Sequence, residues 1–508
     1  MKQLFNAFLV LLITTVTFYS CTNASFKESA QDSYFVEEMV VEMAAPNAKS
    51  EPTTDKVISG ESYAEIVEND FLSAKENALS TFSIDVDRAS YSNMRRFLNQ
   101  NQLPPKDAIR IEEMVNYFKY DYPQPTDEHP LSITTEFAEC PWNAENRLVS
   151  IGLQGRLVDT ENIPPMNLVF LIDVSGSMGD DIVMMKEAFK MLVNKMRPED
   201  KIAIVTYAGA SGLALSPTSG NNKRKILAAL SRLQSGGSTA GSEGINLAYK
   251  LAKKNFVKGG NNRVILATDG DFNVGVTGDE ALVSLIEKRR EEGVFLSVLG
   301  FGMGNYQDAK MEQLADNGNG NYAYIDNIDE AKKVFVTEMS GTLYTIAKDV
   351  KLQLEFDSKY VESYRLIGYE NRLLANEDFD NDAIDAGDMG AGHTVTALYE
   401  IVPAQNTTNK DLIDIKFRYK QPEGNVSQLL QVKATDKGGD WSNASLNTRW
   451  AASVASFGMV LRDSKYKGNA TFDSVKDWAK AAKGADLDGY RGEMIGLIES
   501  ASVLSATN

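Results

Sequence analysis

The residues that decide the fold read LVFLIDVSGSM at positions 168–178. The first five are apolar without interruption, which is typical of a strand whose two faces are both covered. Asp173, Ser175 and Ser177 follow at its end, and Gly176 allows a sharp turn between the two serines. In open α/β sheets, ligands bind at the carboxyl ends of the strands. This loop therefore presents a carboxylate and two hydroxyls where a ligand would bind.

Strands and helices alternate on the C-terminal side of this stretch. Short apolar runs that fit buried strands are separated by longer segments with helical periodicity. Such alternation predicts a mostly parallel sheet with helices on both faces. The expected strands lie at 168–173, 202–207, 263–268, 294–300 and 321–325, and the expected helices at 182–196, 223–233, 244–255, 279–291, 306–316 and 329–342.

Two other loops of this region add oxygen ligands. The glycine-rich residues 236–238 precede Thr239, which can present a hydroxyl, and the strand 264–268 ends in Asp269. Together with the first loop they place carboxylates and hydroxyls at one edge of the sheet. Hard oxygens suit Mg²⁺, and Ca²⁺ or Mn²⁺ are alternatives. Water or a carboxylate from a partner would complete the coordination.

These residues resemble the metal-ion-dependent adhesion site of the von Willebrand factor type A (VWA) domain, in the same order and on the same elements. The resemblance covers residues 165–345. It implies a Rossmann-like six-stranded sheet, and it implies that an acidic side chain of a protein partner completes the coordination of a metal held by Asp173, Ser175, Ser177, Thr239 and Asp269. Asp271 and Asn273 are expected to lie behind these ligands or to shape the loop.

The segments on either side narrow the resemblance to one bacterial group of exported, often lipid-anchored VWA proteins. Residues 82–118 look like its N-terminal module, and residues 365–400 contain motifs of its C-terminal domain of unknown function. An economical arrangement pairs residues 131–155 with 350–433 in one antiparallel β-sandwich, into which the VWA domain is inserted. The expected divisions are a signal peptide at 1–20, a tether at 21–78, the N-terminal module at 79–128, a β segment at 129–160, the VWA domain at 161–345, a β-rich domain at 346–440 and a helical segment at 441–508.

The first residues of the chain are typical of an export signal. Lys2 is followed by an apolar run that is short for a membrane span, and then by Ser20 and Cys21. Residues 17–21 resemble a bacterial lipoprotein box, which implies that Cys21 carries lipid. The lipid would anchor a flexible tether to the cell envelope, at the periplasmic face or the cell surface; the alternative is an ordinary secreted protein. If Cys21 is lipidated, Cys140 has no partner for an intrachain disulfide.

Composition limits the classes of function. The 508 residues carry a formal net charge of −18 with a pI near 4.8, which argues against nucleic-acid binding and against electrostatic docking on anionic lipid. Only two cysteines and two histidines are present, so we expect a metal with oxygen ligands rather than a zinc site. His393 begins an expected strand, and we interpret it as structural.

Three functions fit these features. The first is a binding protein whose metal captures an acidic side chain of a protein partner. The second is a hydrolase that uses the same ion, but the motif has no histidine nearby, and the chain has no Gly-x-Ser-x-Gly elbow and no phosphate-binding glycine loop. The third is an envelope scaffold in which the metal only stiffens the fold. The sequence favours the first, which is not an enzyme.

Overall fold

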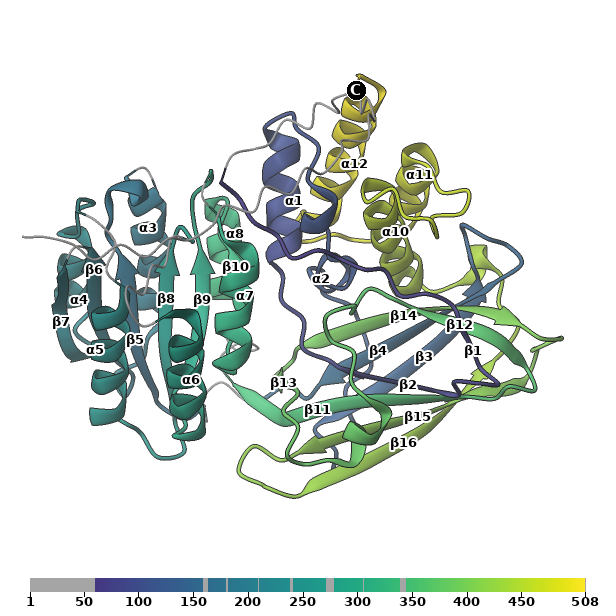
Figure 1. Cartoon of the computed structure of the whole chain (residues 1–508), viewed down its shortest axis with the longest axis horizontal. Coiled ribbons are helices and arrows are strands. Elements are labelled where there is room, and N and C mark those ends of the chain that lie inside the picture. The colour runs from purple at the N-terminus through teal and green to yellow at the C-terminus, as the bar shows by residue number, and fades with distance from the viewer. Residues whose placement is uncertain are drawn as a thin grey trace, which may run out of the picture. The chain divides into compact units, whose positions relative to one another are not determined.

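A six-stranded sheet forms the centre of the α/β region (Figure 1). The strand order is β10-β9-β8-β5-β6-β7, and every neighbouring pair is parallel except β6 and β7, which run antiparallel. This confirms the expected mostly parallel sheet and adds the edge strand β7, whose mixture of small and polar residues gives no clear strand pattern. The strands are β5 (Met166–Asp173), β6 (Lys201–Ala208), β7 (Ala210–Ser219), β8 (Asn261–Thr268), β9 (Phe295–Gly300) and β10 (Tyr322–Tyr324).

The coordinates come from a computed structural model. It describes residues 60–158, 163–179, 181–208, 210–237, 241–270, 278–304, 306–338 and 344–507. All of these belong to one unit of the chain, Ile58–Asn508.

Helices cover both faces of the α/β sheet. Alternate residues of β5 point to opposite faces, as they must in a strand. Phe170 packs against Phe189 of α3 with the rings tilted by 34° and their centroids 4.0 Å apart. Leu171 lies in the other core cluster with Ile245 of α5. One face carries α3 (Asp181–Lys195), α4 (Lys223–Ser231), α8 (Ile328–Lys332) and the π-helical turn η5 (Lys333–Thr337), and the other carries α5 (Gly241–Lys254), α6 (Gly278–Glu291) and α7 (Asp308–Asn317).

Two antiparallel sheets are formed by the flanking segments. Their orders are β1-β12-β14-β4-β3 and β13-β11-β15-β16, and β2 also pairs with β11. Apolar side chains of both sheets share one core. Strand β4 precedes the α/β region and pairs with β14, which follows it, and this confirms the expected pairing across the insertion. The bounds are β1 (Leu72–Ser73), β2 (Leu79–Ser83), β3 (Leu131–Glu139), β4 (Arg147–Gly155), β11 (Thr345–Phe356), β12 (Val361–Ile367), β13 (Gly387–Gly390), β14 (Thr394–Pro403), β15 (Lys410–Lys420) and β16 (Ser427–Asp436).

The two ends of the inserted α/β region are held at one turn of the sandwich. The backbone N–H of Gly392 donates to the carbonyl of Arg156, just after β4, at 3.1 Å. The neighbouring N–H of Ala391 donates to the carbonyl of Tyr344, just before β11, at 2.8 Å. The chain therefore leaves the sandwich and returns to it at adjacent points.

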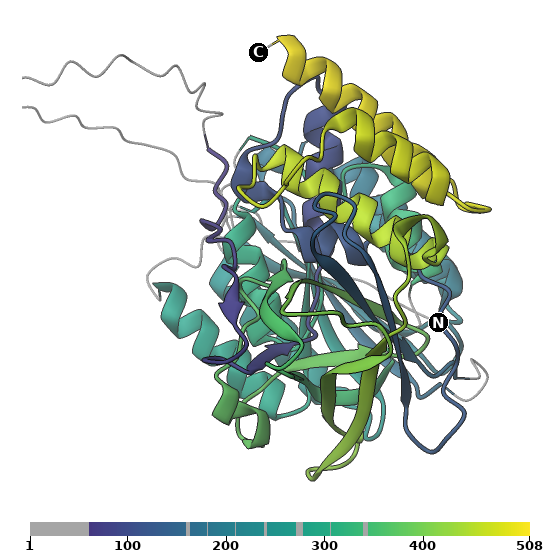
Figure 2. The ribbon, with the colours of Figure 1, turned by 90° about the vertical axis from the view of Figure 1, so that its right-hand side faces the viewer.

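Helices from both ends of the described chain share a third core. Figure 2 shows the C-terminal helices, in yellow, next to α1. Trp450 of α10 packs edge-on against Phe118, which follows α2, with ring centroids 5.0 Å apart. The helices of this core are α1 (Ala89–Asn99), α2 (Ile111–Asn116), α10 (Leu446–Leu461), α11 (Phe472–Ala482) and α12 (Tyr490–Thr507). The flanking segments also contain the short 3₁₀ turns η1 (Lys106–Ala108), η6 (Asn376–Asp380) and η7 (Trp441–Asn443).

Buried arginines join the flanking parts to the α/β region. Each guanidinium is surrounded by carboxylates, which is the condition under which a buried charge is tolerated. The pairs are Arg95 with Asp326 and Glu330, Arg110 with Asp308, and Arg372 with Glu312 and Asp316.

Candidate metal centre

The loop after β5 holds Asp173 in a fixed orientation. Asp173 is 0% exposed, and one of its carboxylate oxygens, Oδ1, accepts a 2.8 Å hydrogen bond from the backbone N–H of Ser175. The hydroxyls of Ser175 and Ser177 lie 2.9 Å apart. Ser175 is buried and Ser177 is exposed, in the 3₁₀ turn η3 (Gly176–Met178) that leads toward α3. The first three predicted ligands are therefore gathered on one loop.

Asp269 comes from the neighbouring strand. β5 and β8 are parallel neighbours in which Ile172 pairs with Ala267, so both strands end at the same edge. The hydroxyl of Thr268 lies 3.5 Å from Oδ2 of Asp173. Burial raises the pKa of Asp173 to about 6, and the negative charge of Asp269 contributes to the rise. The two carboxylates therefore lie close enough to repel each other.

The glycine-rich loop before α5 is bonded to the Asp173 loop. The N–H of Gly236 donates to the carbonyl of Val174 at 2.7 Å, and the N–H of Gly176 donates to the carbonyl of Gly237 at 3.2 Å. Gly237 has a φ of +99°, a conformation that favours glycine. Thr239, two residues further on, lies outside the described residues.

The remaining predicted residues are not described either. Asp271 and Asn273 fall in the gap after residue 270, and Cys21 precedes residue 60. Their roles stay predictions. The structure thus describes four of the five expected ligands, Asp173, Ser175, Ser177 and Asp269, at adjoining positions of one sheet edge.

Sequence reasoning missed other groups at this edge. Thr268 contacts Asp173, and its position directly before Asp269 was the available signal. Asp181, at the start of α3, was not foreseen. A Cβ built on Gly302 would lie 2.8 Å from Oδ2 of Asp181 and 3.3 Å from Cβ of Asp269, so Asp181 and Asp269 flank this glycine. Nothing in the sequence near Asp181 indicates that neighbourhood.

The donors at this edge fit a hard divalent cation. They are carboxylate and hydroxyl oxygens, the ligands that Mg²⁺ and Ca²⁺ prefer. In the described part of the chain, no lysine, arginine or histidine forms an ion pair with Asp173. A buried carboxylate without a cationic partner is unfavourable, and a bound cation would offset that cost.

Comparison with known families divides the chain into the same segments. A model described as von Willebrand factor type A domain matches residues 167–337, and one described as von Willebrand factor matches residues 57–150. A third, described as the C-terminal part of uncharacterized protein YfbK, matches residues 341–504. Uncharacterized protein YfbK of Escherichia coli (strain K12) is 44% identical over 467 residues, which cover 86% of this chain and 80% of YfbK. The chain belongs to the YfbK family.

Membership of the YfbK family confirms the three-part organisation, with a VWA domain between two family modules, and the function of YfbK itself is uncharacterized. Human inter-alpha-trypsin inhibitor heavy chain H4 is 28% identical over 259 residues, 48% of this chain and 27% of that protein. A solved von Willebrand factor type A structure from Catenulispora acidiphila has a TM-score of 0.42 and 15% identity, covering 75% of this chain and 91% of that one. Within the described ranges, no helix combines the length and the apolar character needed to cross a membrane.

Proposed function

We propose that this YfbK-family protein binds a protein partner through a divalent cation, in the first place Mg²⁺, at the carboxyl edge of its VWA sheet. The observation that carries the proposal is the buried Asp173, whose loop aligns two serine hydroxyls beside Asp269. When bound, the ion would offer a coordination position to a carboxylate of the partner. Thr239 is proposed as a further ligand from the motif alone.

The protein's own residues prepare this site before an ion binds. The N–H of Ser175 fixes one oxygen of Asp173, and the hydroxyl of Thr268 lies near the other. Ser177 is exposed, so the site opens toward solvent on the side of this turn. A rigid, partly open set of oxygen donors favours capture of an external ligand.

We propose a binding role rather than catalysis. Metal-assisted hydrolysis generally needs a positioned base beside the activated water. Both histidines are engaged in the β-sandwich and its surroundings: His129 with the hydroxyl of Tyr419 at 2.8 Å, and His393 with Arg88 at 2.7 Å. An envelope scaffold with a structural metal remains the alternative, and it predicts that chelation lowers the melting temperature without releasing partners.

We also propose that the protein acts at the bacterial cell envelope, anchored by lipid on Cys21. The support is the sequence of the first 21 residues and their resemblance to a lipoprotein box. In cells that express the full chain, Cys21→Ala should move the protein from the membrane fraction to the soluble fraction. A variant that stays in the membrane fraction would contradict the anchor and leave the metal site unaffected.

The test of partner binding is a crosslinking pull-down from envelope extracts with Mg²⁺ or with EDTA. Wild-type protein should retain a set of partners with Mg²⁺ and lose it with EDTA, and Asp173→Ala should lose the same set in both conditions. The matched control is Asp473→Ala, which removes a carboxylate whose side chain is 81% exposed on α11. If Asp173→Ala keeps the Mg²⁺-dependent partners, the proposal is wrong. If chelation changes only the melting temperature, the scaffold alternative is favoured.

A further inference from the structure

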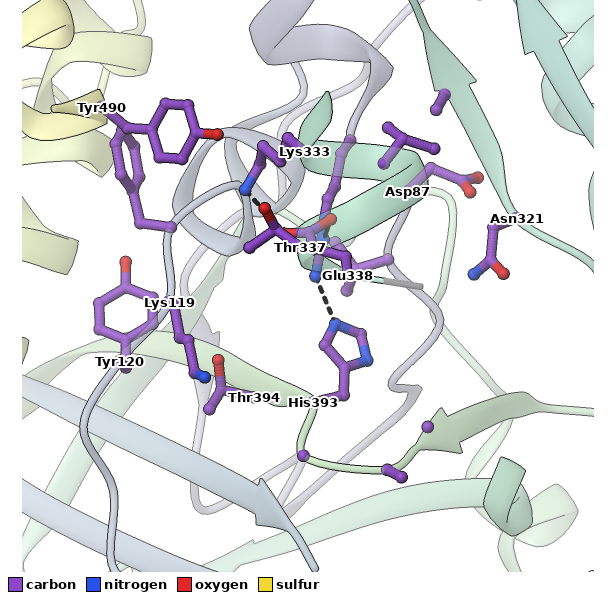
Figure 3. Close-up of a pocket in the computed structure, with 18 of the residues that line it drawn as sticks. Asp87, Lys119, Tyr120, Asn321, Lys333, Thr337, Glu338, His393, Thr394 and Tyr490 are labelled. Atoms are coloured by element: carbon purple, nitrogen blue, oxygen red, sulfur yellow. Dashed lines mark hydrogen bonds and ion pairs between the residues drawn. The ribbon is translucent and has the colours of Figure 1, made fainter. Parts of the chain in front are cut away.

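A cavity of about 820 Å³ lies among the VWA domain, the N-terminal module, the sandwich and the C-terminal helices (Figure 3). Its wall includes Asn321 of the VWA domain, Lys119 of the N-terminal module and Thr394 of β14. Tyr490 of α12 lines another side. This volume is in the range of pockets that hold small organic ligands.

Part of the wall is a chain of charged groups that compensate one another. Lys333 of η5 donates to Glu338 at 2.7 Å, and Arg88 pairs with the same carboxylate. Nη2 of Arg88 also lies 2.7 Å from Nε2 of His393. The ring of His393 is labelled in Figure 3, where a dashed line marks its hydrogen bond. Burial and the positive charge of Arg88 lower the pKa of His393 to about 3, so the ring is neutral and accepts this hydrogen bond. Lys333 and Arg88 are therefore already engaged with the protein.

Arg263 lines the same cavity, but unlike Lys333 and Arg88 it has no carboxylate partner among the described residues. It is 4% exposed, near the start of β8, and its Nη1 donates to the hydroxyl of Ser297. Its Nε is buried without a hydrogen-bond partner. Among the described residues, Arg263 forms no ion pair. Asp388 attracts it electrostatically from the cavity wall but is bonded to Asn319 at 3.1 Å. The aromatic ring of Phe295, with its centroid 5.7 Å from Cζ of Arg263, gives a weak cation–π contact.

An unpaired buried guanidinium is costly for a protein to maintain. Burial lowers the pKa of Arg263 to about 10, opposite to the direction for the ion-paired Arg95. A buried arginine whose charge is compensated only by a hydroxyl, a ring face and a distant carboxylate has donors left that suit a planar carboxylate from outside. This geometry is what a ligand anchor requires.

The cavity around Arg263 also has apolar walls. Ile265 lies two residues further along β8 and therefore on the same face of the sheet. Leu299 of β9, Leu192 of α3 and Phe335 of η5 also line the cavity. Apolar surface of this kind favours a hydrocarbon group over water.

We propose that this cavity binds a small carboxylate with an apolar body, whose acid group pairs with Arg263. The carboxylate would receive the guanidinium donors that the protein leaves unpaired, and the apolar body would contact Ile265, Leu299 and Phe335. The site is separate from the metal centre, so it does not depend on the function proposed above.

The test uses isothermal titration calorimetry with two acids and their uncharged counterparts: decanoate against decanol, and N-acetyl-leucine against N-acetyl-leucinamide. All titrations contain EDTA and use both wild-type protein and Asp173→Ala, because a carboxylate could otherwise bind a metal ion. Decanoate binding indicates a lipid-like ligand, and N-acetyl-leucine binding a peptide-like one. Both proteins should bind at least one acid about tenfold or more tightly than its uncharged counterpart.

Variants decide whether Arg263 is the anchor. Arg263→Met should abolish the preference for the acid and should not lower the melting temperature, because it replaces an unpaired charge with an apolar side chain of similar length. The matched control is Arg232→Met, which removes an exposed arginine at the end of α4 and should bind like wild type. If Arg263→Met fails to fold, Thr337→Trp provides a second test, because it fills space from an exposed position on the cavity wall and should weaken acid binding.

Three outcomes would overturn the proposal. The first is that neither acid binds the wild-type protein. The second is that acid and uncharged counterpart bind equally well. The third is that Arg263→Met, or Thr337→Trp where the former does not fold, binds the acid as wild type does.

Discussion

Arg95 and Asp173 are both buried charged residues, yet the protein surrounds them differently. The guanidinium of Arg95 lies 2.7 Å from Glu330 and also contacts Asp326, Glu493 and the hydroxyl of Tyr117. The carboxylate of Asp173 receives hydrogen bonds from neutral groups, and no described cationic side chain forms an ion pair with it. At the contact between α1 and the VWA domain, the fold neutralises its own charges. At the sheet edge it leaves a negative charge for something else to neutralise.

The difference separates a structural ion-pair cluster, at Arg95, from the site that we propose to bind a cation, at Asp173. A buried charge that the fold compensates fully stabilises one arrangement of the parts and has no capacity left for a ligand. A buried charge that the fold compensates poorly costs stability, and such sites are where function is expected. Substitution of Arg95 should therefore lower the stability of the fold, whereas substitution of Asp173 should chiefly remove the response to a divalent cation.

The largest expected effect is the removal of Arg95. Arg95→Met should lower the free energy of unfolding by about 3–5 kcal/mol, because it leaves Asp326 and Glu330 buried without their cation. Urea denaturation of the protein measures the change in the free energy of unfolding. Arg232→Met, at an exposed position, is the control and should change stability by less than about 0.5 kcal/mol. A loss of less than about 1 kcal/mol for Arg95→Met would show that the ion pairs of Arg95 with Asp326 and Glu330 do not stabilise the fold.

The next effect is stabilisation by a divalent cation at the Asp173 loop. Mg²⁺ at 100 times its dissociation constant should raise the free energy of unfolding of wild-type protein by about 2.7 kcal/mol. Asp173→Asn should abolish this response, because the amide keeps the shape of the side chain but not its charge. Thermal unfolding with and without Mg²⁺ measures both. If Mg²⁺ stabilises Asp173→Asn as much as wild type, the cation binds elsewhere. Asp173 would then not differ from Arg95 in its capacity for a ligand.

The third expected effect is a pH dependence of stability that arises from the buried His393. The pKa of His393 is lowered from 6.5 to about 3, first by burial and then by Arg88. The unfolded chain thus binds a proton below pH 6.5 that the folded protein does not bind, and stability should fall as the pH drops from 6.5 toward 3, by at most about 1.4 kcal/mol per pH unit. His393→Gln should reduce this slope, measured by urea denaturation between pH 7 and pH 4. If both proteins show the same slope, His393 does not carry the effect.

The smallest effect is expected at a solvent-exposed ion pair. Lys480 and Glu499 lie 3.0 Å apart on α11 and α12, with side chains 51% and 52% exposed. Lys480→Met should change the free energy of unfolding by about 0.5 kcal/mol or less, because water screens such pairs. A larger loss, in the range expected for Arg95→Met, would mean that exposure does not distinguish the two classes of ion pair.

The sequence predicted the loop after β5 and its place at the sheet edge, because the information for both is local; that the loop binds a metal stays a prediction. The strand, the spacing of Asp173, Ser175 and Ser177, and the following helix are contiguous, and Asp269 follows a strand of the same apolar type. The pairing of β4 with β14 was also predictable, since both segments alternate and lie on either side of a complete α/β pattern.

Long-range electrostatics was not predictable. The helix α1 contains Arg95 and Arg96 side by side, and no local pattern shows that Arg95 meets carboxylates more than 200 positions away. The same holds for Arg263, whose lack of an ion pair depends on what the sandwich places opposite it. The closeness of Asp181 to Asp269 likewise depends on how the end of β9 turns at Gly302.

The two chain ends of the inserted VWA domain meet at a single turn of the sandwich, and this has a consequence for folding order. Closing β4 onto β14 requires bringing together segments separated by an entire domain, and the entropy lost in closing a loop grows with its length. Once the VWA domain has folded, Arg156 and Tyr344 are held near each other, and the remaining closure involves only the turn at Ala391 and Gly392. We therefore expect the inserted domain to fold first and to act as the nucleus around which the two halves of the sandwich assemble.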